Sequence, residues 1–239
     1  MGVLLELGRL PLAIFAKKNF IKNWERIAIR EKANVLLKSS YQHSIQNNTG
    51  WASSIIKDHL SQIDLMNVFL NQGNKKPAHI ETFNRESDIF YQTSFFEINN
   101  NSSKLKTYAK LKTNIEREIY LNNIPNVTDR ISMTKFRLSN HKLMIEKGRH
   151  NNIEHDKRYC PFCPNCIENE YHFIIKCPAY DPIRVILLEK IDIENQHLSN
   201  ESLFSFLMTN KHIVRHTANF ITRASDVRDF LRENHRHFC

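Results

Sequence analysis

Four cysteines and one histidine fall within residues 160 to 177, in the segment CPFCPNCIENEYHFIIKC. The whole chain of 239 residues contains only 5 cysteines, so this cluster does not reflect a cysteine-rich composition. A tetrahedral metal site needs four sulfur or nitrogen ligands, and a C-x2-C turn commonly supplies two of them. The spacing therefore predicts that this segment folds around a metal ion.

Spacing alone leaves two choices for the first pair of ligands. Cys160 with Cys163 forms one C-x2-C turn, and Cys163 with Cys166 forms another, while His172 and Cys177 supply the second pair in either case. The proline in CPFC stiffens the earlier turn, but both arrangements close geometrically. A histidine among the ligands favours Zn²⁺ over iron, and four protein ligands favour a structural site over a catalytic one.

The second pair of ligands constrains the backbone between them. We expect a helix from Ile167 to about Lys176, and five residues on an ideal α-helix turn about 500°, so His172 and Cys177 would point about 140° apart. Both can bind one ion only if the helix ends between them or just before Cys177, which the following Pro178 favours. Three apolar residues of this helix are expected to form a small core over the metal: Tyr171, Ile174 and Ile175.

The rest of the chain is expected to be mainly α-helical. It has only 5 Gly and 7 Pro, and its apolar residues recur at helical spacing, as in the stripe formed by Ile14, Ile21, Trp24, Ala28 and Val35. The only strand signal is a possible short hairpin at the cysteines. The predicted helices cover residues 11–38, 51–70, 105–119, 130–147 with a left-handed cap at Gly148, a segment starting at Asp181 and Pro182, and 211–233.

A polar run, EINNNSSK, divides the sequence. We expect an N-terminal helical region over residues 1–96, a linker over 97–103, and a helical domain over 104–239 that contains a zinc knuckle at 159–180. The architecture predicted is a set of bundle-like helical segments with the small zinc module in the C-terminal third.

The formal net charge is +9, and two patches hold all of the excess. Residues 1–38 and 130–158 each carry eight Lys or Arg against three acidic residues. Concentrated positive charge attracts phosphate backbones of RNA or DNA, although a solvated face has the same composition. The candidate phosphate-binding residues precede the cysteines: Arg130, Lys135, Arg137, Lys142, Arg149 and Arg158.

The N-terminus is apolar but does not indicate a signal peptide or a membrane span. Its longest uncharged run, from Leu10 to Ala16, is too short for either. Clustered cysteines without a secretory signal indicate metal ligands in a reducing compartment. We therefore expect an intracellular protein, in the nucleus or cytoplasm, that is not secreted and not membrane-bound.

Several blocks in order resemble the C-terminal region of non-LTR retrotransposon reverse transcriptases. They are ELGRLPL at 6–12, LKTYAKLKTNIEREIYL at 105–121, TKFRLSNHKLMIEKGR at 134–149, YCPFC with ENEYHFIIKCPAYDPIR within 159–184, and FITRASDVR at 220–228.

The resemblance implies a zinc knuckle that handles template RNA or target DNA. Its pattern places the ligands at Cys160, Cys163, His172 and Cys177 and leaves Cys166 outside the set. No two acidic residues are adjacent in the chain, whereas a polymerase needs paired aspartates to hold its metal ions. The expectation is a non-catalytic nucleic-acid-binding module. The alternatives are a zinc-stapled structural or protein-interaction domain, and an inert remnant of a mobile element.

Overall fold

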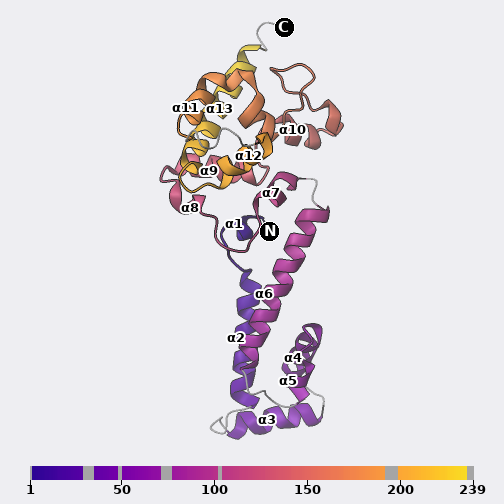
Figure 1. Cartoon of the computed structure of the whole chain (residues 1–239). Coiled ribbons are helices and arrows are strands. Elements are labelled where there is room, and N and C mark those ends of the chain that lie inside the picture. The colour runs from indigo at the N-terminus through magenta and orange to yellow at the C-terminus, as the bar shows by residue number, and fades with distance from the viewer. Residues whose placement is uncertain are drawn as a thin grey trace. The chain divides into compact units, whose positions relative to one another are not determined.

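The computed structural model describes residues 2–28, 35–47, 50–70, 77–101, 104–191 and 199–235. Nearly all of their regular structure is helical, which confirms the mainly α prediction (Figure 1). Within these ranges there is no β-strand, and the only β pairing is an isolated antiparallel bridge between Tyr159 and Ile167. The chain forms two compact units, a smaller one of Arg9–Phe96 and a larger one of Met1–Gly8 with Glu97–Cys239.

The smaller unit is built on a long helix pair. Helices α2 (Leu12–Ala28) and α6 (Ala78–Phe96) lie side by side (Figure 1), and three shorter helices complete the unit: α3 (Val35–Gln46), α4 (Trp51–Gln62) and α5 (Met66–Leu70). Its core consists of buried apolar side chains from α2, α4, α5, the start of α6 and the turn between α4 and α5: Ile21, Trp24, Ile56, Leu60, Ile63, Leu65, Val68 and Ala78.

The predicted stripe of residues 11–38 is correct for α2 and wrong beyond it. Ile14, Ile21 and Trp24 are buried as expected, but Val35 is exposed because it starts the separate helix α3. The predicted helix at 51–70 is also two helices, since the chain turns at Asp64, whose φ is +58°. Helix α6 was not predicted.

The larger unit contains the remaining elements. They are α1 (Gly2–Glu6), the π-helical turn η1 (Glu97–Asn101), α7 (Lys106–Leu111), α8 (Tyr120–Asn123), α9 (Val127–Arg137), α10 (Met144–His150), η2 (His155–Lys157), η3 (His172–Lys176), η4 (Pro178–Tyr180), α11 (Asp181–Leu188), α12 (Asn200–Thr209) and α13 (Val214–His235). Residues 97–101, expected in a linker, are thus helical, while 102 and 103 lie outside the described residues.

The first eight residues belong to the larger unit, whereas the sequence predicted that they belong with the N-terminal helical region of residues 1–96. The backbone N–H of Glu118 donates to the carbonyl oxygen of Glu6 over 3.0 Å. Gly8 has a φ of +58°, and a Cβ there would come within 2.6 Å of the backbone nitrogen of Arg117. The loop after α7 therefore needs glycine at position 8 to pack closely against this N-terminal segment.

The predicted helix over 105–119 ends early, at Leu111. The next residue, Lys112, is buried, and its ammonium group donates to the Glu116 carbonyl and to the Glu118 carboxylate over 2.5 and 2.6 Å. A longer helix was expected because the apolar residues keep helical spacing through this stretch. A buried lysine needs oxygen partners, however, and the non-helical backbone after Leu111 provides them.

The predicted helix over 130–147 is interrupted. Ser139 has a φ of +51°, and its N–H donates to the Phe136 carbonyl, while the Asn140 N–H donates to the Lys135 carbonyl. This is a Schellman cap with serine in the position that glycine usually takes, and it ends α9. The expected cap at Gly148 is wrong, because Gly148 lies inside α10.

The last two predictions for helices are confirmed. Helix α11 begins at Asp181 with Pro182 in its first turn, and α13 buries Phe220 and Ala224 on its inner side. The core of the larger unit joins these helices to α9, α12 and the cysteine segment. No helix in the described part of the chain combines the length and apolarity needed to cross a membrane.

Candidate metal centre and adjacent basic cleft

The first two cysteines are presented by a tight hairpin. The bridge between Tyr159 and Ile167 closes it, and the Cys160 N–H donates to the Cys166 carbonyl over 2.7 Å. Asn165 takes a left-handed conformation, with a φ of +59°, which asparagine tolerates better than most residues. The hairpin suggested by the sequence is confirmed, and it turns the side chains of Cys160 and Cys163 to the interior.

A π-helical turn presents the second pair. It spans His172–Lys176, and the Cys177 N–H donates to the His172 carbonyl over 2.8 Å. The helix expected from Ile167 to about Lys176 is therefore wrong in its start, which comes at residue 170, and in its α-helical type, but it ends before Cys177 as expected. A hydrogen bond from i+5 to i closes a wider turn than the α-helical bond from i+4, so residues five apart return to the same side. Asn169 supports the start of this turn by accepting from the His172 N–H over 2.7 Å.

The four predicted ligands converge on one point. The ligand atoms of Cys160, Cys163, His172 and Cys177 all lie within 4.8 Å of one another, and all four residues are buried. Cys166 is exposed and does not belong to the group. The structure thus selects the earlier of the two C-x2-C pairs that spacing left open.

The distances fit a tetrahedral ion. The Cys177 Sγ atom lies 3.8 Å from that of Cys160 and 3.6 Å from that of Cys163. Metal–sulfur bonds of about 2.3 Å in a tetrahedron set neighbouring sulfurs about 3.8 Å apart. His172 Nε2 is buried and has no hydrogen-bond partner within the described structure. A buried polar atom without a partner is costly, and a metal ion would satisfy it.

The three thiols also affect one another's protonation. A hydrogen bond from Cys177 lowers the pKa of the Cys160 thiol to about 4, while the same interaction and burial raise the pKa of Cys177. Burial likewise raises the pKa of Cys163. Burial disfavours several thiolates side by side unless a cation lies among them to balance their charge. This chemistry suits a site that exchanges protons for a metal ion.

Arg184 supports the metal segment from α11. Its guanidinium is buried and donates to the carbonyl oxygens of Ile174 and Cys177 over 2.7 and 2.6 Å, and it pairs with Asp181. These carbonyls lie at the end of the π-helical turn, where helical hydrogen bonding stops. Arg184 thus holds the backbone that carries Cys177.

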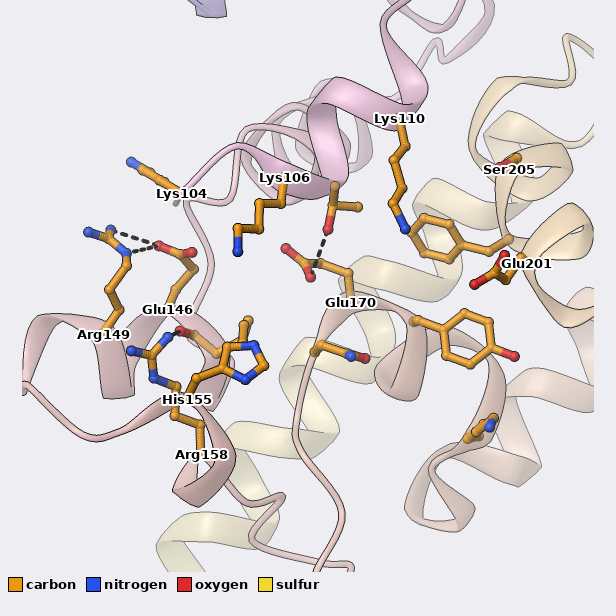
Figure 2. Close-up of a pocket in the computed structure, with 16 residues that line it drawn as sticks. Lys104, Lys106, Lys110, Glu146, Arg149, His155, Arg158, Glu170, Glu201 and Ser205 are labelled. Atoms are coloured by element: carbon orange, nitrogen blue, oxygen red, sulfur yellow. Dashed lines mark hydrogen bonds and ion pairs between the residues drawn. The ribbon is translucent and has the colours of Figure 1, made fainter. Parts of the chain in front are cut away.

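A basic cleft of about 820 Å³ lies against the same segment (Figure 2). Six Lys or Arg side chains line it against three glutamates. The basic residues of this cleft are Lys104, Lys106, Lys110, Arg149, Arg158 and Lys176, and the glutamates are Glu146, Glu170 and Glu201. In Figure 2 Lys104, Lys106 and Lys110 come from α7 and the segment just before it, and Lys106 extends into the space, on whose other side Arg158 lies.

Two of the three glutamates have partners inside the fold. Glu146 accepts from Arg149 Nε and Nη2 over 3.1 and 2.8 Å. Glu170 accepts from Thr107 and Ser139, and its carboxylate lies 3.1 Å from His141 Nε2. Burial alone would raise the pKa of Glu170, but hydrogen bonding to His141 and its charge lower it. The lysines therefore dominate the charge that the cleft presents.

Known proteins offer no guide to this site. The chain matches no protein-family model, no curated protein and no solved structure.

The six candidate phosphate-binding residues do not form one surface. Arg149 and Arg158 line the basic cleft. Arg137 is fully buried and donates to Glu6 over 2.8 Å and to Glu118 over 2.7 Å. A guanidinium with two carboxylate partners in the core cannot reach a phosphate backbone, so the assignment of Arg137 to nucleic-acid contact is corrected.

The remaining three lie away from the cleft. Arg130 donates to the Ile124 carbonyl over 3.0 Å, and Lys142 forms an exposed ion pair with Asp229. Lys135 is exposed on α9.

Sequence reasoning missed the lysines of α7. Lys106 and Lys110 are four residues apart, a spacing that places two side chains on one face of a helix. The spacing was available in LKTYAKLKT, but residues 39–129 as a whole carry nine Lys or Arg against nine acidic residues, so net charge did not single out this segment. Only the fold shows that these lysines line the same cleft as Arg149 and Arg158.

Proposed function

We propose that this chain is a non-catalytic, zinc-binding module that binds nucleic acid. The observation that carries the proposal is the group of three sulfurs and one unpartnered imidazole nitrogen, spaced for one tetrahedral ion. Thiolates with an imidazole suit Zn²⁺, and four protein ligands complete its coordination.

The role proposed for the ion is structural. When bound, it would crosslink the hairpin that carries Cys160 and Cys163 to the π-helical turn that carries His172 and Cys177. With all four positions taken by protein, no coordination site is left for a water nucleophile. The protein's own residues would do the remaining work, since Arg184 and Asn169 orient the ligand-bearing backbone.

The nucleic-acid part of the proposal rests on charge. The chain carries a net charge of +9, and the basic cleft lies on the metal-binding segment. Lysine and arginine side chains gathered at one site attract phosphates by releasing counterions. A folded zinc module beside such a site is a common arrangement in proteins that bind nucleic acid.

The sequence resemblance supports a more specific origin. We propose that the chain corresponds to the C-terminal region of a non-LTR retrotransposon reverse transcriptase, a region that lacks the polymerase and endonuclease motifs. The supporting evidence is the order of the blocks at 105–121, 134–149 and 159–184.

A second candidate is a purely structural or protein-interaction domain in which zinc only stabilises the fold. The observation that favours it is the internal use of several basic side chains. Arg137 is buried with carboxylates, and Arg158 donates to the carbonyl oxygens of Ile145 and Ile153, both over 3.0 Å.

Two measurements on the purified full chain test the first proposal. Metal analysis should find one zinc per chain, and binding of a labelled RNA or DNA oligonucleotide should weaken steeply as salt rises. If the chain holds one zinc but binds no oligonucleotide, the second candidate, a structural or protein-interaction domain, is favoured. A chain that folds fully without any metal would remove the basis of both.

A further inference from the structure

We infer that the basic cleft is a binding site for single-stranded nucleic acid, with phosphates on the lysines of α7 and a base against Tyr171. The inference rests on the proposed function and names the form of nucleic acid recognised and the residues that do it. Three features of the cleft carry it: free lysines, an aromatic lining and a concave shape.

The ammonium groups available for phosphate are those of Lys104, Lys106 and Lys110. Among the described residues no hydrogen bond or ion pair engages any of the three, whereas Arg149 is held by Glu146. Lys106 and Lys110 are exposed, and Figure 2 shows both side chains extending from α7 into the cleft. Unpaired ammonium groups can exchange counterions for phosphates without breaking an internal ion pair.

Two aromatic side chains line the same cleft. The rings of Tyr171 and Phe204 have centroids 6.2 Å apart and are tilted by 57°. Tyr171 is only half-buried, and Lys176 Nζ lies 5.2 Å from its ring centroid. Aromatic rings interleaved with lysines are the combination by which proteins bind single strands, because every base has a face that can stack.

The shape of the cleft favours a single strand over a duplex. Its volume of about 820 Å³ falls within the range of sites that enclose a small ligand, so it can take a few nucleotides. A duplex keeps its bases stacked inside and its phosphates on a convex outer surface, so it would contact only the rim. An unpaired strand can place a base and its flanking phosphates inside.

The cleft is continuous with the metal-binding segment. Asn169, Glu170 and Tyr171 directly precede the ligand His172, and Lys176 directly precedes Cys177. Any loss of the metal-bound fold would displace this wall. Single-strand binding should therefore require the metal as well as the lysines.

The test compares single-stranded and duplex oligonucleotides of one sequence, about 20 nucleotides long, by fluorescence anisotropy with the zinc-loaded full chain. The cleft variant is Lys106→Ala with Lys110→Ala. The matched control removes two exposed lysines outside the cleft, Lys190→Ala with Lys211→Ala. Zinc content and circular dichroism confirm that both variants fold.

The cleft variant should bind the single strand at least about 10-fold more weakly, and its slope of log affinity against log salt should fall by about 1.4, since each phosphate contact contributes about 0.7. The control should keep the wild-type slope. Tyr171→Leu should weaken binding about 10-fold, whereas Tyr171→Phe, which keeps the ring, should not.

The outcomes separate the two proposals. Equal losses in the cleft variant and the control, or a duplex bound as tightly as the single strand, would overturn the cleft assignment alone. If the zinc-loaded wild-type chain binds neither probe, the proposed nucleic-acid function fails, and the cleft assignment fails with it.

Discussion

Arg228 in α13 donates from Nε and Nη2 to the two carboxylate oxygens of Glu168, each over 2.6 Å, although the residues are 60 positions apart. Both side chains are buried, with exposed fractions of 2% and 1%. Glu168 also accepts from the Met144 N–H over 2.6 Å. This ion pair ties the metal-binding segment to the C-terminal helix and to the start of α10.

Replacing Arg228 by methionine should destabilise the larger unit by about 3–5 kcal/mol, because Glu168 would keep a buried charge without its partner. Urea denaturation followed by circular dichroism measures the change. Arg223→Met, on an exposed position of the same helix, is the control and should cost no more than about 0.5 kcal/mol. Adding Glu168→Gln to Arg228→Met should recover part of the loss. A cost below about 1 kcal/mol for Arg228→Met would contradict this account.

Metal removal should affect the two units differently. A chelator should unfold the larger unit, where a structural zinc contributes on the order of 10 kcal/mol, and leave the smaller unit folded. Both tryptophans, Trp24 and Trp51, lie in Arg9–Phe96, so their fluorescence reports on the smaller unit alone. We expect a large loss of helical circular dichroism with little change in the fluorescence unfolding transition.

Single cysteine changes refine that experiment. Cys163→Ser should reproduce the effect of the chelator, since it removes one of the four converging ligands. Cys166→Ser is the matched control, three positions along the same hairpin, and should retain stoichiometric zinc. Loss of zinc from the Cys166→Ser protein would show that the ligand set is wrong.

The stability of the smaller unit should fall in mild acid through His59. This side chain is buried on α4, and burial lowers its pKa, as does the charge of Lys17, against the opposing effect of Glu86. The unfolded chain therefore takes up a proton near pH 6.5 while the folded chain resists it, so stability declines as pH falls below about 6.5.

Tryptophan fluorescence during urea unfolding at about pH 7.5 and 5.5 measures this decline. A single titrating side chain can change the free energy of unfolding by at most about 1.4 kcal/mol per pH unit. His59→Leu should be less sensitive to pH than the wild-type chain. The exposed His43→Leu is the control and should keep the wild-type pH dependence. Identical pH profiles for the wild-type and His59→Leu chains would sink the prediction.

Gly148 and Arg158 should be strongly coupled. A Cβ at Gly148 would lie 2.6 Å from Cγ and 3.0 Å from Cδ of Arg158, whose guanidinium donates to two backbone carbonyls. Gly148→Ala should therefore destabilise the wild-type chain by about 1–3 kcal/mol. In an Arg158→Ala background the same change should stabilise α10 by about 0.5–1 kcal/mol, because alanine favours the helix. Additive effects in this double-mutant cycle, measured by urea denaturation, would count against the contact.

Local features of the molecule could be predicted from the sequence. The spacing of the cysteines predicted a hairpin and a four-ligand group, because covalent geometry limits which side chains within a short segment can reach one ion. The apolar stripe that includes Ile21 and Trp24 predicted the buried face of α2, since a helix repeats every 3.6 residues. The start of α11 at Asp181 followed from the proline beside it.

Other features depend on partners distant in sequence, and only the tertiary structure decided them. The burial of Arg137 requires Glu6, 131 positions away, and the helix end at Leu111 requires oxygen partners for Lys112. The basic cleft exists because the fold places α7 opposite Arg149 and Arg158. The choice of Cys160 over Cys166 as the partner of Cys163 was open on spacing alone. The fold of the hairpin decides it, because a metal ion needs its ligands to converge in space. The thiols of Cys160 and Cys163 lie close to His172 and Cys177, whereas Cys166 is exposed.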